Sequence, residues 1–454
     1  MKKQLSLTEG DVTAGLLRFS IPFLLTNILQ ACYGASDLFM VGHFSDAVGV
    51  SAVATGGQVM QMITGLAIGL TAGGTVIIAR HFGAKRRSAV ANAAATVLIL
   101  FGALSFLMTA ATALLVTPIC RLMQVPPDAF QTTREYLLIC SAGICFIVAY
   151  NAVCSILRGL GDSKTPLLFM IAACIINVST DLLFVGVLRM GAPGAAVSTV
   201  IAQAASVLLI LIYLSCKGFL RRYRSRKPCF VLRSARDILG VGLPIALQEG
   251  LVNFSFLIIT AVINTLGLIA SAAVGVVEKL IAFSMLPPTA VASAVAAMTA
   301  QNIGAGQPGR AHQCRRTGIR LSLLFGVAFY LCAQLNAIGL VSFFTNDPLV
   351  IQAGALYLRS YSLDCMLVCF VFSMNSYFSG SGHPVFPLVH SLISTLLLRI
   401  PLSYYFSRLP GAGLYLVGFA APAASLLSVV LSLIFLRIQR EKRPIKSSTP
   451  LPQS

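Results

Sequence analysis

The chain has 454 residues, of which 57% are hydrophobic and only 10% are charged, and its mean hydropathy is +0.86. Soluble domains carry about 25% charged residues, so this composition excludes an ordinary soluble globular protein. The formal net charge of +19 would suit a nucleic-acid partner, but the basic residues are spread over the connections between apolar runs. We therefore expect a lipid bilayer as the environment and no nucleic-acid partner.

Twelve long apolar runs predict an all-α integral membrane protein. About 20 residues cross a bilayer as a helix, and these runs are too long and too continuously apolar for the alternating strands of a closed barrel. When both termini are placed in the cytoplasm, the basic residues fall mainly in the inner connections, as the positive-inside rule requires. The predicted spans are 14–38, 48–79, 89–117, 134–157, 166–188, 193–216, 238–263, 268–299, 317–344, 354–378, 385–408 and 412–437.

The chain repeats itself with a period of about 221 residues. Pro22 corresponds to Pro244, Gly83 corresponds to Gly304, and "RGLGDSKTP" corresponds to "SGSGHPVFP". Each half then holds six spans in the same orientation, and such halves pack around a central cavity. We expect two pseudo-symmetric six-helix bundles. The predicted parts are an N-terminal lobe (1–216), a basic cytoplasmic linker (217–236), a C-terminal lobe (237–437) and a cytoplasmic tail (438–454).

Five acidic residues lie inside the apolar runs instead of the connections. They are Asp37, Asp181, Glu249, Glu278 and Asp364. A carboxylate is costly in hydrocarbon, so an acid that lies there usually faces a cavity and handles an ion or a proton. The sequence lacks the GxxxxGK[ST] and HExxH patterns of nucleotide and zinc sites. These features favour a secondary transporter that has no cofactor and no metal centre and is not an enzyme.

Asn177 and Asp181 are four residues apart, so they share a helical face. With Asp37 they would form a site able to hold a proton, or to coordinate a hard cation such as sodium through Asp37 and Asp181. A purely structural pair of hydrogen-bonded acids is the alternative. Glu249 and Asp364 are candidates for contact with the substrate or the ion, whereas Glu278 neighbours Lys279 and is open to a local ion pair.

The motifs together resemble the multidrug and toxic compound extrusion (MATE) family over essentially the whole chain, and its DinF-like prokaryotic branch most closely. The resemblance is carried by "DLFMVGHF" (37–44), "ARHFGAKRR" (79–87), "RGLGDSKTP" (158–166), "NVSTDLLFV" (177–185) and "AQNIGAG" (300–306). It implies a twelve-helix secondary transporter of the bacterial cytoplasmic (inner) membrane that expels cationic drugs in exchange for protons or sodium.

The resemblance also implies roles for particular residues. The family's coupling site has an aspartate in the first helix, an asparagine and an aspartate in the fifth and a threonine in the sixth. A tyrosine and an asparagine of the fourth helix line the cavity, and a proline of the first helix is the hinge. By motif and spacing these are Asp37, Asn177, Asp181, Thr199, Tyr136, Asn151 and Pro22.

We therefore expect an antiporter that exports amphipathic organic cations in exchange for protons by alternating access, with a single chain as the working unit. Sodium coupling is the first alternative: the sodium-coupled branch relies on second-half acids, and since Glu249 and Asp364 are not assigned to those positions, the coupling ion stays open, with protons favoured. A flippase for a lipid-linked precursor would need a basic cavity, and only Lys279 and Arg399 lie well inside the spans. A polytopic membrane enzyme would need a polar catalytic cluster, which the sequence does not offer.

Overall fold

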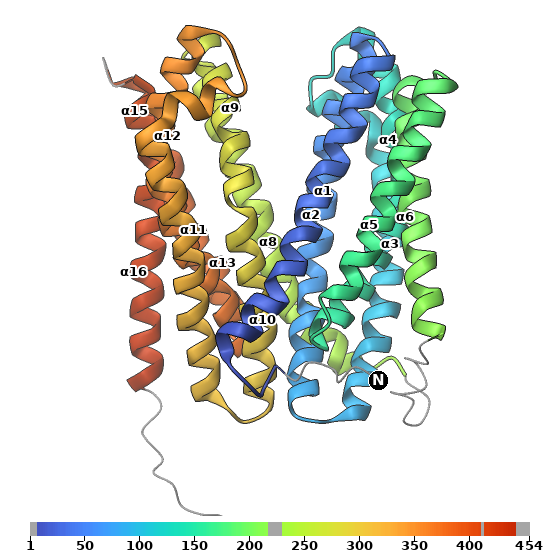
Figure 1. The fold of residues 1–454 in the computed structure, drawn as a ribbon, viewed down its shortest axis with the longest axis vertical. Helices are drawn as coiled ribbons and strands as arrows, with labels where there is room; N and C mark the ends of the chain where they lie inside the picture. The colour runs from blue at the N-terminus through green and yellow to red at the C-terminus, as the bar shows by residue number, and fades with distance from the viewer. Residues whose placement is uncertain (1–6, 217–228, 410–412, 442–454) are drawn as a thin grey trace, which may run out of the picture. The chain divides into compact units, whose positions relative to one another are not determined.

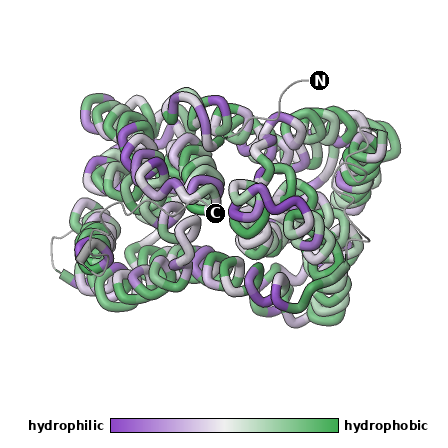
Figure 2. The backbone as a smooth tube through the Cα atoms, turned by 90° about the horizontal axis from the view of Figure 1, so that it is seen from below, coloured by the Kyte–Doolittle hydropathy of each residue, from purple (hydrophilic) through white to green (hydrophobic). Residues whose placement is uncertain are grey.

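A computed structural model describes residues 7–216, 229–409 and 413–441, and the described part is almost entirely helical. Within these ranges, twelve helices or helix pairs are long and apolar enough to cross a membrane, and each coincides with one of the predicted spans. The prediction of a twelve-helix integral membrane protein is confirmed. Figure 2 shows the helices as mostly apolar, with hydrophilic stretches among the connections.

The first half forms six spans (Figure 1). They are α1 (Val12–Phe44), α2 (Ala47–Gly83), α3 (Arg87–Leu122), α4 (Pro127–Gly159), α5 (Lys164–Asp181) with the π-helical segment η1 (Leu182–Val187), and α6 (Gly191–Cys216). Helix α4 packs against α2, α3 and α6, and α1 packs against α5. The most buried span of this half is α4, which packs mainly against α2, α3 and α6.

The second half forms the other six spans, and several of them are broken. They comprise α8 (Leu232–Asn264), α9 (Leu268–Ser284), α10 (Leu286–Gly304), α11 (Pro308–Ser342), α12 (Pro348–Ser381), α13 (Val385–Ser394), η2 (Thr395–Arg399), α14 (Ile400–Arg408), α15 (Gly413–Gly418) and α16 (Ala420–Glu441). The break between α9 and α10 falls at Met285, directly before Pro287 and Pro288. A proline lacks the amide donor that a continuous helix needs, which explains this break.

Contacts divide the chain into two compact units that do not follow the sequence halves. Unit 1 comprises the described residues of Met1–Asn253, Thr289–Arg320 and Ser376–Pro387. Unit 2 comprises those of Phe254–Pro288, Leu321–Asn375 and Leu388–Ser454. The predicted lobe boundary at the linker stays a prediction, since 217–228 lie outside the described residues and α8 already begins at Leu232.

Helices of unit 1 approach each other at glycines. A Cβ atom on Gly83, at the end of α2, would collide with the carbonyl oxygen of Gln301 in α10, and one on Gly304 would collide with the carbonyl of Arg80. The repeat relates these two collisions, because an offset of 221 residues takes Gly83 to Gly304 and Arg80 to Gln301. The ends of α2 and α10 therefore cross in backbone contact in a pseudo-symmetric way.

Side-chain hydrogen bonds repeat this symmetry beside the crossing. Gln301 Nε2 donates to the carbonyl of Gly159 at 2.9 Å. Arg80 Nη2 donates to the carbonyl of Gly380 at 3.5 Å. The same offset takes Arg80 to Gln301 and Gly159 to Gly380, so each half contributes one donor and one acceptor to the other.

Gly83→Val and Gly304→Val are expected to destabilise the protein because the added side chain separates the two backbones. Overpacking of this kind costs about 1–3 kcal/mol. The measurement is the thermal unfolding midpoint of the purified protein in detergent. Gly65→Val is the matched control, since it lies in α2 with no atom within 4 Å of its Cβ position. Equal midpoints for all three variants would contradict the close crossing.

Candidate coupling site

Three helices of unit 1 bring the predicted coupling residues together. Helix α1 contacts α5 and α6, and α5 contacts α6. Asp37 projects from α1, Asn177 and Asp181 from successive turns of α5, and Thr199 from α6. Asp37, Asn177 and Asp181 are at most 4% exposed. Residues that are 140 and 162 positions apart in the chain thus meet in one buried polar cluster.

Asp37 is held by a hydrogen bond to each carboxylate oxygen. Asn177 Nδ2 donates to Oδ1 at 3.0 Å, and Thr199 Oγ1 donates to Oδ2 at 2.7 Å. Ser198 fixes the amide of Asn177 in turn, because its hydroxyl donates to the Asn177 carbonyl at 3.0 Å and accepts from Nδ2 at 3.3 Å. The orientation of Asp37 is therefore set from two helices.

Asp181 differs from Asp37 in having no such donors. Both of its carboxylate oxygens are buried without a hydrogen-bond partner within the described part of the chain. Its carboxyl interacts electrostatically with Asp37 and lies beside Ser198. An ionised carboxylate buried in this way is strongly disfavoured unless a proton or a cation compensates it. The pair of acids is therefore suited to bind one positive charge.

The backbone around Asp181 is unusual as well. Helix α5 ends at Asp181, and η1 continues the span as a π-helix. Single π-helical turns inside α-helices are rare and often mark functional sites. Asp181 therefore lies at the junction between two helical geometries.

Sequence reasoning missed two members of the cluster, Tyr33 and Ser198. Tyr33 lies one turn before Asp37 on α1, is 9% exposed and donates its hydroxyl to the carbonyl of Thr199 at 3.1 Å. Because Tyr33 lies four residues before Asp37, the two share a helical face, and this spacing could have indicated Tyr33 from the sequence. Ser198 precedes Thr199 and showed no comparable signal, because serine is common in apolar helices.

The predicted cavity residues of α4 lie at different places. Tyr136 is 3% exposed, packs against Gly56 of α2 and interacts electrostatically with Asp37. Asn151 is buried too, but its side chain donates to the Ile147 carbonyl of its own helix at 2.9 Å. Fifteen residues of helix separate the two by about 22 Å. The structure therefore brings Tyr136, but not Asn151, to the cluster.

Pro22 lies within a continuous α1, well before Asp37 in the chain. The hydroxyl of Thr26 donates to the Pro22 carbonyl at 2.8 Å. The ring of a proline removes the helical hydrogen bond to the carbonyl four residues before it, so the weakened turn is the one before Pro22, and the Thr26 hydroxyl lies in the next turn. The hinge role of Pro22 stays a prediction.

The two candidates from the second half are not brought together within one unit. Glu249 is exposed on α8 in unit 1, whereas Asp364 is 5% exposed on α12 in unit 2. Their contact with a substrate or ion stays a prediction. Among the described residues, no three His, Cys, Asp or Glu side chains form a group able to hold a metal ion.

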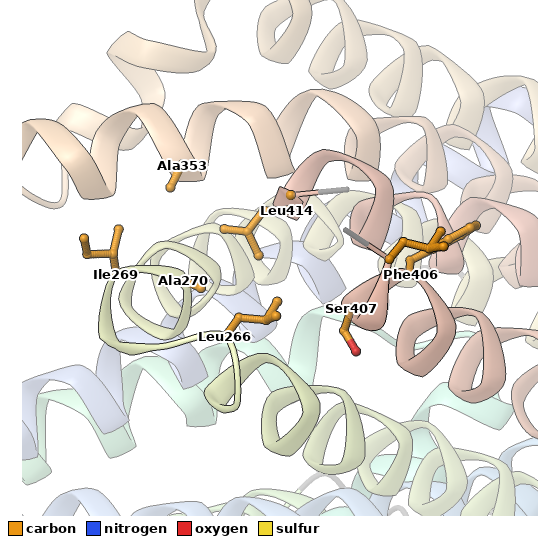
Figure 3. A pocket seen from close by; sticks show the side chains of 9 residues that line it. Leu266, Ile269, Ala270, Ala353, Phe406, Ser407 and Leu414 are labelled. Atoms are coloured by element: carbon orange, nitrogen blue, oxygen red, sulfur yellow. The ribbon is translucent and has the colours of Figure 1, made fainter. Parts of the chain in front are cut away.

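Unit 2 contains an apolar pocket of about 360 Å³ near the connection of α8 and α9. Figure 3 shows Leu266, Ile269, Phe406 and Leu414 around it, with Ser407 as the polar side chain among them. None of the predicted site residues lines this pocket. Its composition suits an apolar group and offers no coupling chemistry.

Comparisons with known proteins agree with the fold and the repeat. The MatE family model matches twice, over residues 22–183 and 244–405. The probable multidrug resistance protein YpnP of Bacillus subtilis is 28% identical over 89% of this chain and 91% of its own length. The FAD transporter of Shewanella oneidensis is 25% identical over 99% of both chains. A crystal structure of MATE in the bent conformation superposes with a TM-score of 0.90 at 24% identity, covering 97% of this chain and 98% of that one.

The two matches of the family model cover the greater part of the chain and begin at Pro22 and Pro244, the prolines that marked the repeat in the sequence. The chain therefore belongs to the MatE family of membrane transporters.

Proposed function

We propose that the chain is a secondary active antiporter that exports amphipathic organic cations in exchange for protons by alternating access. The observation that carries this proposal is the buried Asp181 carboxyl, which has no hydrogen-bond partner among the described residues and interacts with Asp37. Relatives named multidrug resistance proteins support a drug-like substrate. The setting is the bacterial inner membrane, with both termini in the cytoplasm and one chain as the working unit.

Coupling follows because the proton and the cationic substrate compete for the same pair of carboxyl groups. A proton on the Asp37–Asp181 pair removes one of its two negative charges and so weakens its attraction for a cationic substrate, and loss of that proton restores the attraction. Exchange needs the proton and the substrate to favour different states or to exclude each other, because equal binding to both states would shift nothing. The two carboxyls form a site that holds either the proton or the cationic substrate, so that each excludes the other.

The hydrogen bonds around Asp37 favour a proton over sodium. Sodium needs several oxygen ligands at once, but both oxygens of Asp37 already accept hydrogen bonds from Asn177 and Thr199. A proton needs only one oxygen, and Asp181 offers two. Sodium coupling remains the alternative against which the proton is tested.

Asp37→Asn and Asp181→Asn are each expected to abolish proton movement triggered by an organic cation. The measurement uses proteoliposomes with an imposed pH gradient, an enclosed pH dye and ethidium as the substrate, in sodium-free buffer. Asp128→Asn is the matched control, since it removes the same charge from an exposed position in the first turn of α4. A response that needs sodium and survives both cluster variants would contradict proton coupling at this site.

Thr199→Val should slow transport about tenfold, because it removes the hydroxyl that donates to Asp37 at 2.7 Å. A hydrogen bond to a charged group contributes about 1.5–3 kcal/mol, and 1.4 kcal/mol corresponds to a factor of ten. Thr199→Ser keeps the hydroxyl and should retain most of the rate. The measurement is the initial rate of ethidium efflux; equal rates for Val and Ser would argue against the hydrogen bond as the cause.

Exchange of one proton for one monovalent cation moves no net charge, so the membrane potential should have little effect. We expect the steady-state ethidium gradient in valinomycin-clamped proteoliposomes to change less than twofold between 0 and about 100 mV. One net charge per cycle would contribute about 2.3 kcal/mol per 100 mV, a change of roughly 50-fold. A change of that size would overturn one-for-one exchange.

A flavin dinucleotide is the second candidate substrate. The relative named FAD transporter matches over 99% of both chains. Proteoliposomes loaded with FAD, and read by flavin fluorescence under the same pH gradient, separate the two candidates. Proton-coupled efflux of FAD without efflux of ethidium would replace the organic cation as the substrate.

A further inference from the structure

The residues directly before α1 are bound to helices of the second half. Leu7 is buried, and its carbonyl accepts a hydrogen bond from Nδ2 of Asn302 in α10 at 3.2 Å. Nη2 of Arg310, in the first turn of α11, donates to the carbonyls of Glu9 and Gly10 at 2.9 and 2.7 Å. All of these residues belong to unit 1. This segment, which we call the strap (residues 7–10), therefore joins the start of α1 to α10 and α11.

The strap has no free length between its hydrogen bonds and α1. Asp11 follows Gly10 directly and is the N-cap of α1, where its carboxylate accepts from the Ala14 amide at 2.7 Å. One turn further on, a Cβ atom on Gly15 would lie 3.1 Å from the terminal methyl group of Met298, so α1 packs against α10 as well. A movement of α10 and α11 away from α1 therefore has to break the hydrogen bonds of the strap.

The second half makes a related contact with the first. At the offset of 221 residues, Gly10 corresponds to Val231, and the start of α3 corresponds to the start of α11. The amide of Val231, directly before α8, donates to Oγ1 of Thr96 in α3 at 3.1 Å. The residues before the first helix of each half thus bind to the third span of the other half. This reciprocity indicates that the contacts belong to the shared design of the two halves.

The strap lies beside the crossing of α2 and α10. Its partner Asn302 follows Gln301, whose side chain donates to the carbonyl of Gly159 and whose backbone meets Gly83. The strap and the crossing therefore lie at the same end of unit 1, where α2 leads into α3 and α10 leads into α11. In the proposed orientation this end faces the cytoplasm. A transporter that loads its substrate from the cytoplasm has to open this end.

We propose that the strap is a latch that holds the inner end of unit 1 closed, and that release of Arg310 from the carbonyls of Glu9 and Gly10 is a step in opening this end to the cytoplasm. The inference rests on the proposed function, because alternating access is what requires this end to open. Arg310 binds main-chain carbonyls, so the backbone path of the strap matters more than its side chains. Gly10 sets that path, since its φ of +76° lies in the left-handed region that favours glycine.

The test measures the distance between α3 and α11 near their inner ends. Spin labels are attached through p-acetylphenylalanine at Ser88 and Gln313, two exposed positions, so that the native cysteines stay in place. Pulsed electron–electron double resonance is recorded in lipid nanodiscs without substrate or ion gradient. Arg310→Met removes the hydrogen-bond donors, and Gly10→Val strains the backbone of the strap. Size-exclusion elution and thermal unfolding report whether each variant is folded.

Arg310→Met should raise the ratio of a longer to a shorter distance about tenfold, the order expected for loss of a hydrogen bond from a charged donor. Gly10→Val should raise it too. Two matched controls should leave the ratio unchanged. Arg316→Met removes an exposed arginine of the same helix, and Gly267→Val strains a glycine with φ of +103° in unit 2.

An unchanged ratio in a folded Arg310→Met variant, or an equal rise in Arg316→Met, would overturn the inference. If Arg310→Met does not fold, Gly10→Val decides by the same criterion against Gly267→Val.

These outcomes are independent of the proposed coupling. The distance is measured without a drug or a proton gradient, so failure of proton antiport at Asp37 and Asp181 leaves the expected change as it is. Conversely, an unchanged distance ratio would overturn the latch and leave the drug-dependent assay of Asp37 and Asp181 intact.

Discussion

Two carboxyl groups, those of Asp37 and Asp181, are buried in the interior of an apolar helical bundle. Among the described residues, hydrogen-bond donors reach only the first of them. Asp37 receives one donor from α5 and one from α6, so its position is fixed. Asp181, beside it, receives none among the described residues. Burial without compensation is costly for a charge, and in the proposed function this cost makes the site sensitive to a proton or a cation. The packing of α1, α5 and α6 against one another keeps the carboxyl groups of Asp37 and Asp181 together.

The internal repeat provides the rest of the architecture and shows where the two halves diverge. Near Gly83 and Gly304 the repeat is preserved down to reciprocal backbone contacts and reciprocal hydrogen bonds. Near Asn177 the repeat aligns the two halves in sequence but not in chemistry, because the counterpart of Asn177 at the offset of 222 is Arg399. Close packing constrains glycine on both sides of the crossing, because any side chain there would collide.

Much of this molecule is predictable from its sequence. Long apolar runs fixed the number of spans, and the repeat was visible in Pro22 and Pro244 before the family model matched at the same residues. The shared helical face of Asn177 and Asp181 indicated half of the polar cluster, and the resemblance supplied Thr199. The sequence did not reveal Tyr33 and Ser198, since their roles depend on how α1, α5 and α6 pack. The sequence analysis did not predict the π-helical segments η1 and η2 either.

The most direct test of the account is to observe the proton on the acidic pair. Infrared difference spectra of the reconstituted protein, recorded on adding ethidium at constant pH, report loss of a protonated carboxyl group through its C=O stretch. The account predicts loss of one such band of single-carboxyl intensity, shifted in deuterated buffer and absent in Asp181→Asn. An unchanged carboxyl region on substrate binding, or the same band in Asp181→Asn, would contradict a proton held by Asp37 and Asp181.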